Sequence, residues 1–222
     1  NCSMARRKPD PGAIYVSPRL QASLEPMGRC ALTTVTAPMG YGKTTAVNWF
    51  LAAQPPGSAI RVSIYSDSLP ALWEGGRRAF RAAGLTVLEG FDCPMDPAAT
   101  GLLVDTLCRE LRRPEPWYLF ADDLHLLPDP RMARFLCELA ARLPENVHLI
   151  AASRDRILSG DQVLRLGGRL HRIGADQLRL NHTELSIYAR KCGVALTDRQ
   201  MDALLRSSEG WFSAIYLSLC SF

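Results

Sequence analysis

The chain has 222 residues, which is enough for one large domain or for one domain and part of another. Apolar residues make up 47% and charged residues 22%, an ordinary balance for a globular protein with a sizeable core. The net charge of +4 is too small to argue for nucleic-acid binding, since a solvated, arginine-rich surface accounts for it.

The cysteine pattern and the lack of long apolar runs predict the cellular compartment of the protein. The seven cysteines are odd in number and irregularly spaced, and none forms a Cys-x-x-Cys motif. This pattern argues against a disulfide framework and a zinc site, and it indicates a reducing compartment. No apolar run approaches the length that spans a bilayer, and no signal peptide opens the sequence. We therefore expect a cytoplasmic protein with no membrane partner.

The first predicted elements are a short helix, a strand and a longer helix. Ser17 and Pro18 are typical of an N-cap and a first helical position. The β-branched residues of 32–36 predict a strand. Apolar residues at helical spacing from Val47 predict the next helix, and the alternation over 59–65 predicts a second strand.

The middle of the chain continues the alternation of strands and helices. Helices are expected over 72–83 and 99–112, and the apolar run 117–121 predicts a strand that is buried on both faces. A helix that begins at Pro130 and a buried strand over 147–152 follow. Strands that alternate with helices indicate a mostly parallel sheet covered on both faces.

The last third changes character. Residues 153–168 are expected to form a loop, and 170–178 contributes a last strand. Capping-box spacings at 181–184 and 197–200 predict helices. The sequence stops inside the apolar run 211–219, so we expect that more chain follows.

A phosphate-binding loop is predicted between the first strand and the helix after it. The segment Ala-Pro-Met-Gly-Tyr-Gly-Lys-Thr fits the pattern, with alanine at the usual first glycine. Glycines let the backbone point its N–H groups at a phosphate, and the helix N-terminus adds a positive dipole end. Lys43 would reach the β- and γ-phosphates, and the Thr44 hydroxyl would bind Mg²⁺. The candidate nucleotide-binding residues are Ala37, Pro38, Met39, Gly40, Tyr41, Gly42, Lys43, Thr44 and Thr45.

The strand 117–121 ends in two acids, Asp122 and Asp123. The carboxyl edge of a parallel sheet is where ligands bind in such folds. We predict that Asp122 holds Mg²⁺ through the water shell of the ion, and that Asp123 orients or deprotonates an attacking water. His125 either orients Asp123 or packs in the loop.

The strand 147–152 ends in Ser153 and Arg154. Where a sheet places this strand between the other two, a polar residue at its end senses the γ-phosphate, and arginine suits that task. A surface salt bridge is the alternative role for Arg154. The predicted catalytic residues are Asp123, Lys43 and Arg154.

Five segments occur in an order that identifies a family: "VTAPMGYGKTT", "YLFADDLHLL", "HLIAASR", "LRLGGRLHRIGADQLRLNHTE" and "SSEGW". The chain resembles the large LuxR-type, maltose-regulator-like transcriptional regulators among the signal transduction ATPases with numerous domains (STAND). The resemblance implies an α/β P-loop NTPase domain of the AAA+/STAND kind with a mostly parallel sheet over 1–178. The start of a helical lid subdomain follows over 179–222. ATP or ADP with Mg²⁺ is the implied ligand, and Val16 and Arg19 match positions near adenine.

The resemblance also implies a function and leaves alternatives. It implies a nucleotide switch with slow ATP hydrolysis and nucleotide-dependent self-association. DNA would be bound only through a C-terminal helix-turn-helix that these residues do not include. The segment "EGWFSA" lacks the proline of the family's adenine motif, so Trp211 and Phe212 are expected to pack in the core.

The main alternative is an AAA+ motor or loader ATPase with fast, partner-stimulated hydrolysis and an arginine finger. A small-molecule kinase and a binding module without hydrolysis are further alternatives. The candidate fingers are Arg154, Arg165, Arg169 and Arg172.

Overall fold

The computed structural model describes residues 15–64, 67–124, 129–210 and 212–221. Its centre is a five-stranded parallel sheet in the order β2-β3-β4-β1-β5. This arrangement confirms the predicted parallel sheet, and it places β4 between β3 and β1. The strands are β1 (Leu32–Thr36), β2 (Ala59–Ser63), β3 (Trp117–Asp122), β4 (Val147–Ser153) and β5 (Leu170–Ile173).

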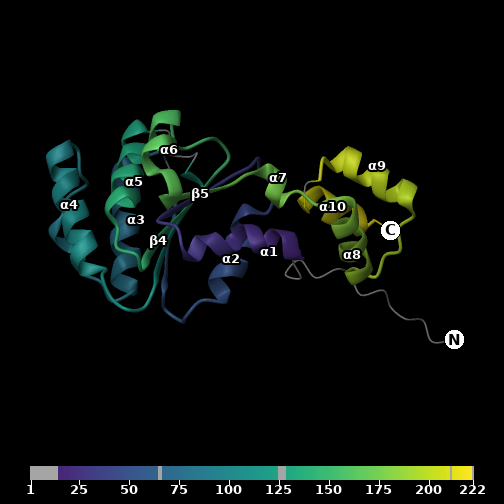
Figure 1. Cartoon of the computed structure of the whole chain (residues 1–222), viewed down its shortest axis with the longest axis horizontal. Helices are drawn as coiled ribbons and strands as arrows, with labels where there is room; N and C mark the ends of the chain where they lie inside the picture. The colour runs from purple at the N-terminus through teal and green to yellow at the C-terminus, as the bar shows by residue number, and fades with distance from the viewer. Residues whose placement is uncertain (1–14, 65–66, 125–128, 211, 222) are drawn as a thin grey trace.

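One face of the sheet is covered by α1 (Pro18–Leu24) and α2 (Lys43–Ala52), which lie together below the strands in Figure 1. The Ser17 hydroxyl accepts a hydrogen bond from the Leu20 N–H at 3.1 Å, so the predicted N-cap is confirmed. A short 3₁₀ helix (Glu25–Gly28) then leads into β1. The buried side chains on this face form one cluster that includes Val35, Val47, Phe50, Tyr118 and Ile150.

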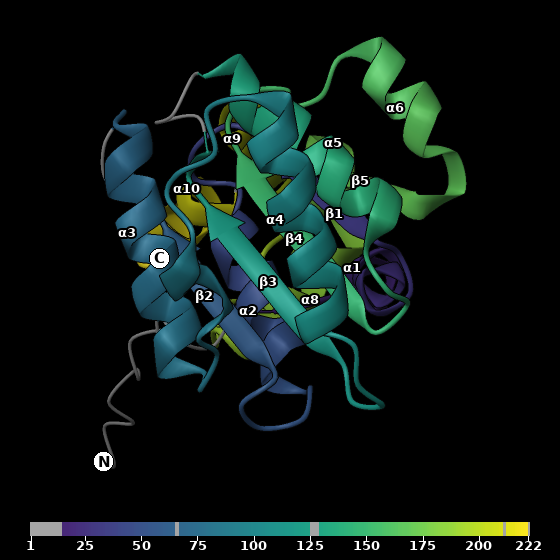
Figure 2. The ribbon, with the colours of Figure 1, turned by 90° about the vertical axis from the view of Figure 1, so that its left-hand side faces the viewer.

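The other face is covered by α3 (Leu69–Ala82), α4 (Pro97–Glu110) and α5 (Pro130–Arg142), which lie in front of the strands in Figure 2. A 3₁₀ helix (Val87–Gly90) lies between α3 and α4. Aspartates cap α4 and α5, and proline occupies their first turns, because its missing N–H costs nothing there. These helices share a second cluster of buried side chains with the sheet.

A third group of helices lies beyond α7 (Ala175–Leu178), at the far end of the molecule in Figure 1. It consists of α8 (His182–Lys191), α9 (Asp198–Ser208) and α10 (Phe212–Leu219). Both predicted capping boxes are present, at the starts of α8 and α9. These helices have their own hydrophobic cluster, which also takes in Tyr15 from the N-terminal segment. Along the described residues, no helix combines the length and apolarity needed to cross a bilayer.

Three expectations were wrong. The last strand does not run over 170–178, because β5 ends at Ile173 and the Gly174 N–H donates to Gln177 Oε1 at 2.8 Å, which starts the helix α7. Residues 153–168 do not form only a loop, because 160–166 forms the helix α6 (Gly160–Leu166), capped reciprocally by Ser159 and Gln162, and a 3₁₀ turn follows at Gly167–Arg169. Strand β3 is not fully buried on both faces. Tyr118 and Phe120 are buried, whereas Leu119 and Ala121 on the opposite face are only half-buried.

Candidate functional site

The loop between β1 and α2 has the backbone conformation that a phosphate site needs. Gly40 and Gly42 have φ values of 89° and 78°, in the left-handed region that favours glycine. Gly42 is also the residue before α2, and no side chain caps the helix there. The first N–H groups of α2 therefore lack a side-chain acceptor from the cap residue, as expected of a loop that receives an anion.

Lys43 lies beside the other predicted catalytic groups. Its Nζ donates hydrogen bonds to the carbonyl oxygens of Ala37 at 2.6 Å and Pro38 at 3.1 Å. Burial lowers the pKa of Lys43, and the positive charge of Arg154 lowers it further. The charges of Asp122 and Asp123 oppose this shift. Lys43 is therefore close enough to Asp122, Asp123 and Arg154 for their charges to change its pKa.

Thr44 and Asp122 connect the loop to the acidic strand end. The Thr44 hydroxyl donates a hydrogen bond to Asp122 Oδ2 at 2.7 Å. The other carboxylate oxygen of Asp122 accepts the backbone N–H of Asp123 at 2.9 Å. A hydroxyl and a carboxylate at this separation suit Mg²⁺, which takes few protein oxygens and completes its shell with phosphates and water. Accordingly, the described residues contain no group of three or more His, Cys, Asp or Glu that would hold a metal by itself.

Asp123 and Arg154 follow the ends of neighbouring strands. Asp123 has φ 57°, in the left-handed region that aspartate enters more readily than most side chains. Ser153 pairs with Thr36 in the sheet, so Arg154 follows β4 at the level where the phosphate loop begins. The condition for its sensor role, a strand between the other two, is met. His125 and Trp211 lie outside the described residues.

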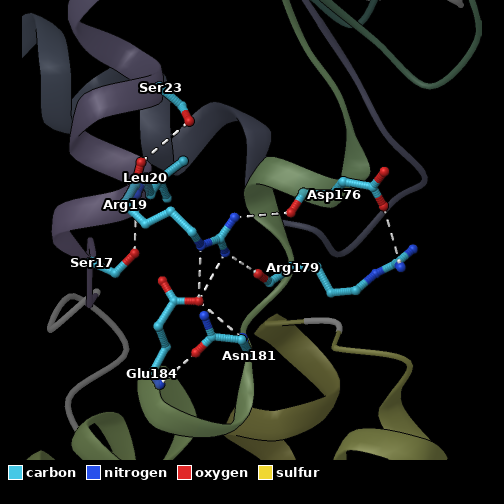
Figure 3. A network of polar contacts seen from close by, with 8 residues as sticks. All are labelled: Ser17, Arg19, Leu20, Ser23, Asp176, Arg179, Asn181 and Glu184. Atoms are coloured by element: carbon cyan, nitrogen blue, oxygen red, sulfur yellow. Dashed lines mark hydrogen bonds and ion pairs between the residues drawn. The ribbon is translucent and has the colours of Figure 1, made fainter.

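The two residues predicted to lie near adenine both contact other parts of the chain, and Arg19 joins three helical segments. Val16 is buried in the same cluster as Tyr41 of the phosphate loop. The Arg19 guanidinium donates to Glu184 Oε1 at 2.8 Å and 3.3 Å, to the Asp176 carbonyl at 3.1 Å and to the Arg179 carbonyl at 2.6 Å. Figure 3 shows these contacts joining α1 to α7 and α8. Contact with adenine stays a prediction for both residues.

Glu184 receives this arginine in a protected position. Its side chain is 7% exposed, and Oε1 also accepts the Asn181 N–H at 2.9 Å, as the capping box requires. Burial would raise the pKa of Glu184, but the hydrogen bonds and charge of Arg19, with help from Ser17 and Asn181, outweigh it and lower the pKa. Sequence reasoning identified Glu184 only as a capping residue, because its partner is 165 positions away.

Arg179 is the second residue that the sequence did not reveal. Its guanidinium lies 6.0 Å from the centre of the Tyr41 ring, and hydrogen bonding with Tyr41 raises the pKa of Arg179. Its side chain packs against Gly210, where any Cβ would collide with it. Leu180 N–H also donates to the Gly210 carbonyl at 3.3 Å. Arg179 therefore contacts both the phosphate loop and the turn between α9 and α10.

Three of the four candidate finger arginines, Arg154 among them, are engaged within the chain. Arg165 pairs with Glu138 at 2.6 Å. Arg169 donates to the carbonyls of Ala140 at 2.8 Å and Leu143 at 3.0 Å. These two hydrogen bonds supply partners for carbonyl groups at the C-terminal end of α5. Arg154 lies 3.7 Å from Asp155, and Arg172 is exposed on β5.

Comparison with known proteins identifies the class of fold as that of P-loop ATPases. No family model matches the sequence. A STAND protein with a tetratricopeptide repeat sensor from Pyrococcus horikoshii is similar over 89% of this chain, with a TM-score of 0.57 and 15% identity. A Walker-type ATPase of Pyrococcus abyssi is similar over 97% of this chain and 69% of its own, with a TM-score of 0.58 and 12% identity. This chain spans 28% of the length of the P. horikoshii protein.

Proposed function

From its P-loop ATPase fold of the AAA+/STAND kind, we propose that this chain is an ATP- and ADP-binding switch domain that hydrolyses ATP slowly with Mg²⁺. The observation that carries the proposal is the 2.7 Å hydrogen bond between Thr44 and Asp122, which joins the phosphate loop to the acidic strand end. A lysine followed by a hydroxyl in this loop serves a triphosphate better than a dinucleotide.

Each residue of the site has a role in this proposal. Lys43 exchanges its bonds to two neutral carbonyls for stronger bonds to the β- and γ-phosphates, in which the donor and the acceptor are both charged. Mg²⁺, when bound, neutralises the charge that builds up on the phosphates. Thr44 would bind the ion and Asp122 would hold it through its water shell, and the site needs little movement for this because the two side chains already touch.

Asp123 and Arg154 act at the γ-phosphate. Asp123 accepts a proton from the attacking water or orients it. Its side chain is one methylene shorter than the glutamate that many related ATPases carry, and general-base geometry is strict, so turnover is slow. Arg154, which is near enough to influence the pKa of Lys43, stabilises charge on the γ-phosphate.

We further propose that the domain belongs to a LuxR-type transcriptional regulator. The five family-like sequence segments and the similarity to a STAND protein support this proposal. ATP and ADP would favour different positions of α8–α10, with differential affinity shifting the population toward a self-associating form. DNA binding would lie in a helix-turn-helix outside this chain.

Titration calorimetry with Mg-ATP and Mg-ADP tests the proposal on the chain and on Lys43→Ala. We expect binding in about the micromolar range that Lys43→Ala abolishes, together with little phosphate release. Arg113→Ala is the control for the loss of one positive charge, because its guanidinium lies over the ring of Trp117, at the opposite end of β3 from Asp122. Binding with rapid turnover would contradict the switch, and equal binding by Lys43→Ala would contradict the site.

A further inference from the structure

A large cavity lies on the face of the sheet that α3, α4 and α5 cover. Its volume is about 760 Å³, within the range of sites for small organic ligands. Figure 2 shows β2 and β3 between α3 and α4, where the cavity has its floor. The residues that define its floor and walls include Ile60, Val62, Leu119, Trp73, Leu107 and Phe135.

The side chains around the cavity are more open than their position in the fold predicts. Strand β3 lies between β2 and β4, and the interior strands of parallel sheets are normally covered on both faces. Leu119 and Ala121 are nevertheless half-buried, as are Trp73 and Phe135 on the helices opposite. The side chains of the described residues therefore leave unfilled an apolar space that an apolar ligand would occupy favourably.

The lining also carries charges, and most of them are already paired. Arg131 is bound by Asp129 at 2.6 Å, and Arg165 is bound by Glu138 at 2.6 Å. The Asp96 carboxylate accepts the Ala99 N–H at the start of α4.

Arg134 is different. It lines the cavity from α5, its side chain is exposed, and within the described part of the chain it makes no hydrogen bond or ion pair. Asp96 keeps its charge as the cap of α4, and Asp129 lies close enough to Arg134 for the two charges to interact. Among the described residues that line the cavity, Arg134 is therefore the cation that no carboxylate contacts within ion-pair distance, and it lies beside an apolar interior.

We propose that this cavity is a second binding site, for a small amphiphile that has an apolar body and one carboxylate. The apolar body lies between the sheet and α3, α4 and α5, and the carboxylate pairs with Arg134. A guanidinium and a carboxylate make a strong, directional pair. The space has walls on several sides, so it suits a chain or ring of small-molecule size better than a helix of another protein.

This site is separate from the proposed nucleotide site. No residue of the phosphate loop lines the cavity. Ala121 and Leu124, which do line it, flank the acids Asp122 and Asp123 in sequence. Ligand binding in the cavity does not depend on the proposed function, so either one can fail alone.

Calorimetric titration of the chain with decanoate, kept below its micelle concentration, tests the proposal. We expect one saturable site per chain. Arg134→Glu should weaken binding by about tenfold, because it removes one exposed ion pair, worth up to about fivefold, and adds repulsion between two carboxylates. Arg199→Glu, an equal charge change on an exposed residue of α9, should leave binding unchanged. Decyltrimethylammonium, which has the same tail and the opposite charge, should bind the native chain more weakly than decanoate.

A cavity-filling variant gives the decisive comparison. Leu119→Trp places a larger side chain in the cavity and should abolish decanoate binding, with circular dichroism to verify the fold. If that variant does not fold, Val62→Phe on the neighbouring strand replaces it. Absence of saturable binding, or equal binding by the filled and native chains, overturns the proposal. A native dimer that Leu119→Trp dissociates, without decanoate binding, would show that a second copy occupies the cavity and would also overturn it.

Discussion

The contact between Arg19 and Glu184 predicts an unequal cost for removing its two partners. Arg19→Met keeps most of the side-chain length but removes the guanidinium, and Glu184→Gln keeps the shape but removes the charge. The Arg19 side chain is 41% exposed, whereas that of Glu184 is 7% exposed. An ion that loses its partner is penalised most when it is buried, because water cannot replace the lost contact.

The structure gives the size of each effect. Arg19→Met leaves a buried carboxylate with the Asn181 N–H, and it removes the bonds to the carbonyls of Asp176 and Arg179. We expect a loss of about 2 kcal/mol, near the middle of the range for hydrogen bonds to charged groups, because the exposed arginine regains some hydration when the protein unfolds. Glu184→Gln retains the capping bond to Asn181 and leaves Arg19 in water and on two carbonyls, so we expect about 1 kcal/mol.

Urea denaturation followed by far-ultraviolet circular dichroism measures both variants and the double variant. The double variant should lose less than the sum of the single losses, since the two residues interact directly. A loss for Glu184→Gln that equals or exceeds that for Arg19→Met would refute the reasoning. Additive losses would show that the contact has no energetic role.

The same pair predicts a pH dependence. The pKa of Glu184 is lower in the folded chain than in the unfolded chain. Its stabilising contribution is therefore complete above the ordinary glutamate pKa of about 4.3, and it is lost as the pH falls through the lower folded value. The stability difference between the native chain and Glu184→Gln should shrink over that acidic window and stay constant near neutral pH. A difference that grows on acidification would contradict this assignment.

The remaining predictions concern the phosphate loop and the turn before α10. Thr44→Val should lower the affinity for Mg-ATP by about tenfold, the worth of one charge-assisted bond, and should change affinity little when EDTA removes Mg²⁺; equal losses in both conditions would contradict a metal role. Asp123→Asn should keep nucleotide binding and reduce phosphate release, and unchanged release would exclude it as the base. Gly210→Ala should destabilise the chain by about 1–3 kcal/mol more than Gly193→Ala. Both glycines have φ near 75–79°, but only Gly210 is packed against the Arg179 side chain; equal urea midpoints for the two variants would show that packing there is loose.

Elements with local signals were predictable. Ser17, Asp129 and Asn181 mark helix starts because each side chain caps N–H groups within three residues of itself. Ser159 also marks a helix start, because it forms a capping box with Gln162 three residues later. This signal was present in the sequence, but the segment was expected to be a loop and it forms the helix α6. That error came from the shortness of the helix, which leaves little apolar periodicity to detect.

The proximity of Thr44 and Asp122 was also predictable, although the two are 78 positions apart. Both follow parallel strands, and the carboxyl ends of parallel strands meet at one edge of the sheet. The half-buried side of β3 was not predictable. A continuous apolar run shows that a strand is able to be buried on both faces, and only the spacing of α3, α4 and α5 decides whether it is.

The sequence by itself determined the class of sheet, the phosphate loop and most helix boundaries, because each of these depends on residues close together in the chain or on the general geometry of parallel strands. The tertiary structure alone decided that β4 lies between β3 and β1, that Arg19 meets Glu184, and that Arg179 lies over Tyr41. The strand order depends on pairing between distant strands, and the two arginine contacts depend on how α7 and α8 pack against α1 and the phosphate loop. Docking is the sum of many weak packing contacts, and it leaves no periodic or short-range pattern in the sequence.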